Sequence, residues 1–164
     1  MNAAVTRIVA GLALLSGAIL TAAPAHSDTL TYRNDRFGTS VSFPPELFRR
    51  AMEPPANGDG MTFLSEDGAS IAVYGFNNAL MADPGELADQ ASDPQGREGF
   101  EITYRRVADT WVVLSGFDDG MVFYNRFLFG ENDVIHAVLI KYPAQAKTIY
   151  DPLVGAIAGS LNGP

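Results

Sequence analysis

From residue 29 onward the chain consists mainly of short runs rich in apolar, aromatic and β-branched residues, separated by Gly, Asp, Asn and Pro. Runs of this length and composition between turn residues are typical of β-strands. The pattern predicts six to eight strands, drawn from the segments 29–34, 39–43, 61–65, 69–76, 101–108, 110–117, 121–129 and 134–142. Residues 46–57 fit no regular element, so we expect them to be irregular.

The last four of these segments are separated by only one to four residues. Connections this short cannot cross over a sheet, so the four strands are expected to form an antiparallel meander. The segments 121–129 and 134–142 carry apolar residues on both faces. A strand of this kind is usually covered on both sides, which predicts that helices pack against the sheet.

Two helices are available as covers. Asp83, Pro84 and Glu86 have the spacing of a capping box with proline at the first helical position, which predicts a short helix ending near residue 92. We expect a helical turn over 144–150, after which Asp151 and Pro152 predict a second helix that begins there and ends near residue 161. The predicted fold class is therefore α+β, with an antiparallel sheet flanked by helices.

The first 25 residues have a different character. One basic residue, Arg7, precedes an apolar run over 8–23, and small residues suit cleavage after Ala25 or after Ser27. This is the pattern of a secretory signal peptide, and the run is shorter than the roughly 20 residues that span a bilayer. We expect a signal peptide over 1–25, one domain over 26–164, a periplasmic or secreted protein, and no stable membrane insertion after cleavage.

Charge and cysteine content exclude several classes of function. The chain has 11 Lys and Arg against 19 Asp and Glu, for a net charge of −8, and loss of Arg7 with the leader makes it −9. Nucleic acid is therefore not an expected partner, because phosphate binding needs clustered Lys and Arg. The chain contains no cysteine, which rules out disulfides, thiol catalysis and cysteine-based metal sites.

The stretch over residues 54–68 is rich in Asn, Asp, Glu and Gly and is the first candidate for a metal site. With Asn57 as the first ligand of a calcium loop, Asp59 fits the third position, but Met61 and Gly68 stand where the fifth and twelfth ligands belong. The favoured interpretation is a turn that leads into a strand, followed by a hairpin at 66–68. Neither a metal nor another cofactor is predicted, and a calcium carrier stays an alternative.

Catalytic patterns are sparse. His26 lies at the leader boundary, and His136 shares a strand face with Val138 and Ile140, which favours a packed structural histidine. No Gly-x-Ser-x-Gly motif occurs, and Gly116 is more typical of a β-bulge. The carboxylates that could act as acid or base fall in predicted hairpin turns: Asp67, Asp118, Asp119, Glu131 and Asp133.

One group of side chains suggests a binding surface. Tyr124 and Arg126 lie on the same strand face as Val122 and Leu128, and neighbouring strands supply further members of the group: Tyr104, Arg105, Arg106 and Trp111. An arginine in an apolar strand needs an anionic partner or access to water. The favoured interpretation is an internal ion pair, and the alternative is a pocket for an acidic ligand or peptide terminus.

Several short motifs together resemble a known group of proteins. They are Tyr-Arg-Asn at 32–34, Phe-Gly at 37–38, Val-Ser-Phe-Pro at 41–44, Asn-Gly-Asp-Gly at 57–60, Trp-Val-Val-Leu-Ser-Gly at 111–116, Tyr-Pro at 142–143 and Tyr-Asp-Pro at 150–152. In this order they resemble small exported bacterial proteins of mostly unassigned function, over nearly the whole mature chain. The resemblance implies the PsbP-like fold, named after an extrinsic subunit of photosystem II, and implies no defined active site.

The sequence thus predicts an exported, non-catalytic binding or accessory module. Its expected partner is an unknown protein or a small acidic ligand, and the candidate ligand or partner surface comprises Asn57, Asp59, Tyr124 and Arg126. Two other classes stay open: a small carboxylate-based hydrolase, and a carrier of calcium or another small ligand.

Overall fold

A computed structural model describes residues 28–164 of the chain. The predicted signal peptide, both predicted cleavage points and His26 lie outside the described residues. In the part of the chain that is described, no helix is long and apolar enough to cross a membrane.

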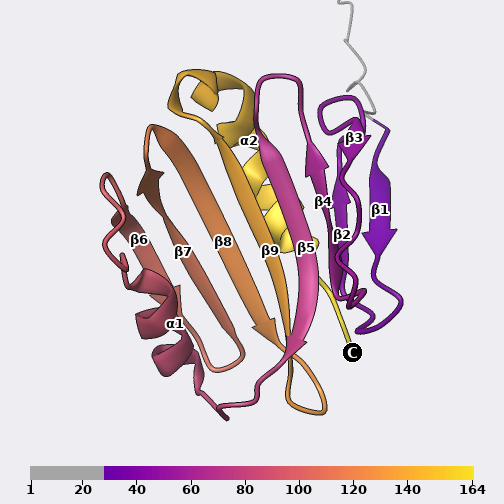
Figure 1. The fold of residues 1–164 in the computed structure, drawn as a ribbon, viewed down its shortest axis with the longest axis vertical. Coiled ribbons are helices and arrows are strands. Elements are labelled where there is room, and N and C mark those ends of the chain that lie inside the picture. Colours follow the sequence, from indigo (N-terminus) through magenta and orange to yellow (C-terminus); the bar gives the residue numbers. More distant parts are fainter. Residues whose placement is uncertain (1–27) are drawn as a thin grey trace, which may run out of the picture.

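A seven-stranded antiparallel sheet forms the body of the protein, in the spatial order β3-β4-β5-β9-β8-β7-β6 (Figure 1). The strands are β3 (Arg50–Ala51), β4 (Gly60–Leu64), β5 (Ser70–Asn77), β6 (Glu101–Val107), β7 (Trp111–Asp118), β8 (Met121–Phe129) and β9 (Val134–Pro143). The predicted meander is confirmed as β6 to β9, and the predicted hairpin as β4 and β5. The irregular segment 46–57 contains one short strand, β3, which the sequence pattern did not predict.

The two N-terminal strands do not join this sheet. β1 (Leu30–Arg33) and β2 (Ser40–Phe43) pair with each other as a separate two-stranded ribbon. Val41 and Phe43 of β2 are fully buried, and the Phe43 ring lies 4.7 Å from that of Phe63 in β4. The predicted single sheet is therefore corrected to a sheet with a ribbon packed on one face.

The first predicted helix is confirmed as α1 (Pro84–Ser92). Its capping box is complete, because the backbone amide of Glu86 donates to Asp83 and the amide of Asp83 donates to the Glu86 carboxylate. Leu87 and Ala88 are buried against the sheet, and α1 packs on β6 and β7.

The second helix begins earlier than the sequence predicts. A short 3₁₀ turn, η1 (Ala144–Ala146), leads directly into α2 (Lys147–Gly159), so Pro152 lies inside the helix instead of at its start. The missing N–H of Pro152 removes one helical hydrogen bond. The additional turn buries Tyr150, whose ring stacks on Tyr142 at 5.2 Å and lies 5.9 Å from Phe48. Tertiary packing thus outweighs the proline signal.

The two faces of the sheet have different covers. On one face, α2 packs on β9 and β8, and together with the β1–β2 ribbon it encloses the larger apolar core (Figure 1). On the other face, α1 encloses a smaller core with β7, β8 and β9. Among the described residues, neither α2 nor the ribbon extends across β6 and β7, so this end of the α2 face is left without a covering element (Figure 1).

Candidate functional site

The uncovered end of the α2 face carries a cluster of aromatic and basic side chains. Strand register places them on one face: Arg106 and Arg126 both lie opposite Val113, and Tyr104 and Tyr124 both lie opposite Ser115. Trp111 is two residues from Val113 on the same side of β7. We call the five side chains Tyr104, Arg106, Trp111, Tyr124 and Arg126 the aromatic–arginine surface.

Trp111 is the centre of this surface. The guanidinium carbon of Arg106 lies 5.1 Å from its ring centroid, and that of Arg126 lies 5.3 Å away. Both are cation–π contacts, and neither arginine forms an ion pair within residues 28–164. The internal ion pair that the sequence favoured for Arg126 is therefore not formed in the described part of the chain.

Arg126 also has an unsatisfied donor. Its side chain is half-buried, and its Nε is shielded from solvent without an acceptor in the described structure. Burial of an unpaired donor costs free energy, about 1–3 kcal/mol.

Tyr104 on β6 and Tyr124 on β8 lie on either side of Ser115 of β7. Tyr104 is 48% exposed, whereas Tyr124 is half-buried. Burial raises the pKa of Tyr124, the nearby Tyr104 raises it further, and the positive charge of Arg126 opposes the shift. At neutral pH the Tyr124 hydroxyl is therefore protonated and able to donate a hydrogen bond.

The adjacent Arg105 belongs to the other face. Its Nη2 lies 2.6 Å from Oδ1 of Asp89 on α1, so it is not part of the aromatic–arginine surface. A β-bulge between Ile102 and Tyr104 sets this register. Gly116 lies opposite the bulge, where an added Cβ would collide with the carbonyl of Glu101, which confirms the predicted bulge position.

Asn57 and Asp59 lie far from Tyr124 and Arg126 in the sheet order, in the turn that leads into β4. Nδ2 of Asn57 donates to Oδ2 of Asp59 at 2.6 Å, and the backbone amide of Gly75 donates to the Asp59 carbonyl. The stretch thus forms a backbone turn, with Gly58 at a φ of +64°. Within residues 28–164, no group of three His, Asp or Glu side chains is arranged to hold a metal ion.

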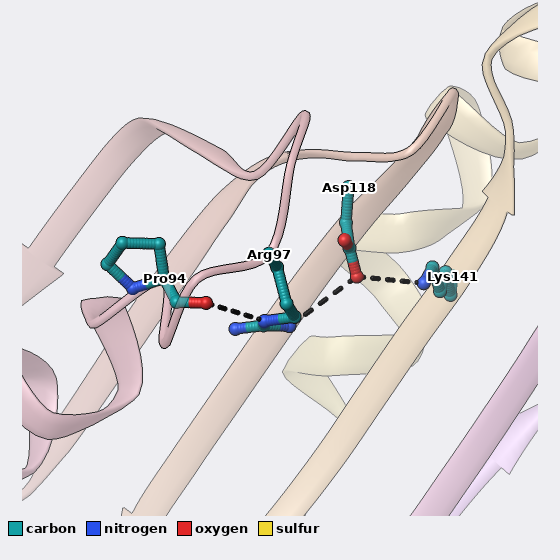
Figure 2. Close-up of polar contacts among 4 residues, drawn as sticks. All are labelled: Pro94, Arg97, Asp118 and Lys141. Carbon is teal, nitrogen blue, oxygen red and sulfur yellow. Dashed lines mark hydrogen bonds and ion pairs between the residues drawn. The ribbon is translucent and has the colours of Figure 1, made fainter.

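A second polar cluster lies on the α1 face (Figure 2). Oδ2 of Asp118 accepts from Nζ of Lys141 at 2.9 Å and pairs with Nη1 of Arg97 at 3.5 Å. Arg97 is held in turn by the carbonyl of Pro94, to which its Nε donates at 3.1 Å. The hydrogen bond from Lys141 is the main cause that lowers the pKa of Asp118, so this carboxylate is ionised at neutral pH.

Arg97, Asp118 and Lys141 line a cleft of about 280 Å³. We call it the Asp118 cleft and define it by Arg97, Phe100, Asp118, Asn125, Leu139 and Lys141. Sequence reasoning identified Asp118 only as a turn residue and did not single out Arg97 or Lys141. Their separation in sequence hides the cluster, since the pairing of β7 with β8 and of β8 with β9, together with the loop after α1, brings them together.

The side chains considered for catalysis have structural contacts. His136 is fully buried, with Nδ1 2.7 Å from Oγ1 of Thr39 and Nε2 3.1 Å from the Pro164 carbonyl. Asp67 accepts hydrogen bonds from Ser65, Ala69 and Tyr150, which lower its pKa against the opposing effect of burial. A general acid at neutral pH needs a raised pKa, and the shifts of Asp67 and Asp118 go the other way.

The arrangement of a meander sheet, a flanking α1 and a C-terminal α2 defines the class of fold: the chain has a PsbP-like fold. It is similar to the solution structure of cyanobacterial PsbP (CyanoP) from Synechocystis sp. PCC 6803, with a TM-score of 0.59 and 10% identity over 88% of this chain and 99% of that one. No family model matches the sequence, and no curated protein matches it either. The likeness confirms the predicted fold and carries no site residues at this identity.

Proposed function

We propose that the protein is an exported, non-catalytic binding module that holds an extended acidic segment of a partner protein on the aromatic–arginine surface. The observation that carries the proposal is that Arg106 and Arg126 both lie against Trp111 without an ion pair among the described residues. The chain has 19 acidic residues, yet none of those described is placed against either guanidinium.

Charge complementarity supports an acidic partner. Arg106 and Arg126 present two positive charges on either side of Trp111, and no described acid neutralises them. Trp, Tyr and Arg are also the residues that contribute most to binding at protein interfaces. A carboxylate placed between the two arginines would gain charge-assisted hydrogen bonds from their guanidinium groups.

The edge strand supports an extended conformation for the bound segment. β6 is the last strand of the sheet, and its outer backbone edge is paired with no other described strand. An added strand from a partner is a common way to use such an edge. Tyr104 and Arg106 on β6 would then contact alternate side chains of the added segment.

The test uses Trp111, the only tryptophan of the chain, as a reporter of occupancy. A peptide of alternating Glu and Leu should give a saturable change in Trp111 fluorescence that weakens with added salt, and its Lys–Leu counterpart should not. Replacement of both Arg106 and Arg126 by Gln should weaken binding at least roughly tenfold.

Arg49→Gln is the matched control, because Arg49 is an exposed arginine whose only described ion pair, with Glu66, is 3.7 Å long. It removes one positive charge at a site away from the aromatic–arginine surface, half of the charge removed in the double variant, and should leave binding unchanged. Equal binding of the two peptides, or equal loss in the control, would reject the proposal. A native partner from an envelope extract counts in favour only if the double variant loses it and the Arg49→Gln protein retains it.

A further inference from the structure

The Asp118 cleft on the α1 face has features that the proposed function does not use. It lies on the opposite side of the sheet from the aromatic–arginine surface, since Phe123 and Asn125 alternate with Tyr124 and Arg126 along β8. We propose that this cleft binds a small organic monoanion, a carboxylate with an apolar body.

The charge of the cleft favours one negative charge. Two cations, Arg97 and Lys141, share one carboxylate, Asp118, so the cluster has a net charge of +1 within a strongly acidic protein. Asp118 has a side-chain exposure of only 17%, whereas the two cations are 48% and 40% exposed. Asp118 therefore fixes the cations from the inner side and leaves their outer hydrogens available to a ligand.

Two further polar side chains face the cleft without protein partners. Neither Ser70 nor Asn125 forms a side-chain hydrogen bond within residues 28–164, and both line the cavity. Ser70 lies directly opposite Lys141 in the β5–β9 pairing, and Asn125 lies opposite Leu139. Lys141 lies on β9 between β5 and β8, so a ligand carboxylate at Lys141 would accept a further hydrogen bond from Ser70 on one side or from Asn125 on the other.

The remaining lining is apolar and shaped by an aromatic stack. Phe100 stacks on Phe123 at 5.3 Å, and the guanidinium carbon of Arg97 lies 4.1 Å from the Phe100 ring centroid. Leu139 and Ala72 complete the apolar surface. A cavity of about 280 Å³ holds on the order of nine waters at ~30 Å³ each, which is room for a compact ligand of about ten non-hydrogen atoms.

The probe that fits these limits is phenylacetate, with 2-phenylethanol as its neutral counterpart and inorganic phosphate as a more highly charged anion. In two-dimensional NMR of the ¹⁵N-labelled protein, phenylacetate should shift the amides of 97–100, 118, 125 and 139–141 along one saturating curve. The neutral alcohol should bind at least roughly tenfold more weakly, because it forms no charge-assisted hydrogen bond.

Two variants test the assignment of the polar end. Lys141→Gln and Asn125→Leu should each weaken phenylacetate binding, Lys141→Gln by roughly tenfold. Asn125→Leu keeps all charges, so it remains informative if Lys141→Gln disturbs the Asp118 cluster. Arg126→Gln, on the opposite face, should leave phenylacetate binding unchanged, which separates this inference from the proposed function.

Three results would overturn the inference. Equal binding of phenylacetate and 2-phenylethanol would show that the cleft has no preference for a negative charge and acts only as an apolar patch. Tighter binding of phosphate than of phenylacetate would assign a different anion class. Shifts scattered over the surface, or no saturating shift, would show that the cleft binds no small monoanion.

Discussion

Arg126→Met gives the sharpest test of the interpretation of the aromatic–arginine surface. Methionine keeps an unbranched apolar stem beside Val113 and Val138, the residues opposite Arg126 on β7 and β9, and removes the guanidinium. If Arg126 formed a buried ion pair, its replacement would lower the free energy of unfolding by about 3–5 kcal/mol. Arg126 has no such pair in the described chain, so we expect its replacement to leave the free energy of unfolding unchanged or to raise it.

The magnitude follows from two opposing contributions. Loss of the buried, unsatisfied Nε removes a penalty of about 1–3 kcal/mol. Loss of the contact with Trp111, 5.3 Å away, removes about 0.5–1 kcal/mol of favourable cation–π energy at this partly exposed site. The free energy of unfolding of Arg126→Met should therefore be equal to that of the wild type or higher by up to about 2.5 kcal/mol.

Equilibrium unfolding in urea, followed by far-ultraviolet circular dichroism, measures this difference. Arg106→Met is the matched control, because Arg106 contacts the same ring at 5.1 Å but is exposed and has no buried unsatisfied nitrogen. It should be slightly destabilised, by less than about 1 kcal/mol. A destabilisation of Arg126→Met by more than about 1 kcal/mol would refute the reasoning, since it would mean that the guanidinium is satisfied within the fold.

Three other predictions concern stability. Asp83→Ala removes the N-cap of α1 and should lower the free energy of unfolding by about 1 kcal/mol in the same urea assay. Burial raises the pKa of Tyr142 and Tyr150, and hydrogen bonds to Asp151 and Asp67 raise it further, so both favour the protonated state on folding. The stability that this preference contributes is complete below about pH 10 and is lost as the pH rises toward the folded pKa values. The double Tyr→Phe variant should therefore lose less stability at alkaline pH than the wild type does. An equal loss in the two proteins would contradict the assignment. Gly60→Ala should be strongly destabilising, because an added Cβ would collide with the Val73 carbonyl, whereas Gly155→Ala, with open space on α2, should raise the melting temperature.

Local patterns were sufficient to predict much of the fold. The meander follows from connections too short for a crossover, and α1 follows from a capping box that is fully formed. The start of α2 was predicted wrongly, because Asp151 and Pro152 have the local pattern of a helix start and the burial of Tyr150 is a tertiary effect. The separate β1–β2 ribbon was missed for the same reason, since alternation predicts strands but not which sheet they join.

The two candidate sites differ in how visible they are in the sequence. Alternation along β8 was enough to place Tyr124 and Arg126 on one face. The register of β6 was needed to assign Arg106 to that face and Arg105 to the other. The Asp118 cleft depends on three segments far apart in the chain, and Asp118 alone resembles any turn aspartate. The unusual signal was Lys141, a charge in a strand that is otherwise apolar on both faces.

Strand β8 carries both candidate sites in one continuous stretch, since Tyr124 and Arg126 face one way while Phe123 and Asn125 face the other. Point substitutions can therefore alter one site and leave the other intact, so the two can diverge independently in evolution. Insertion or deletion of a single residue in β8 would alter both sites at once, because it reverses the direction of every side chain beyond it. The length of this strand is thus under a double constraint, and natural variation near residues 123–126 is expected to be by substitution alone.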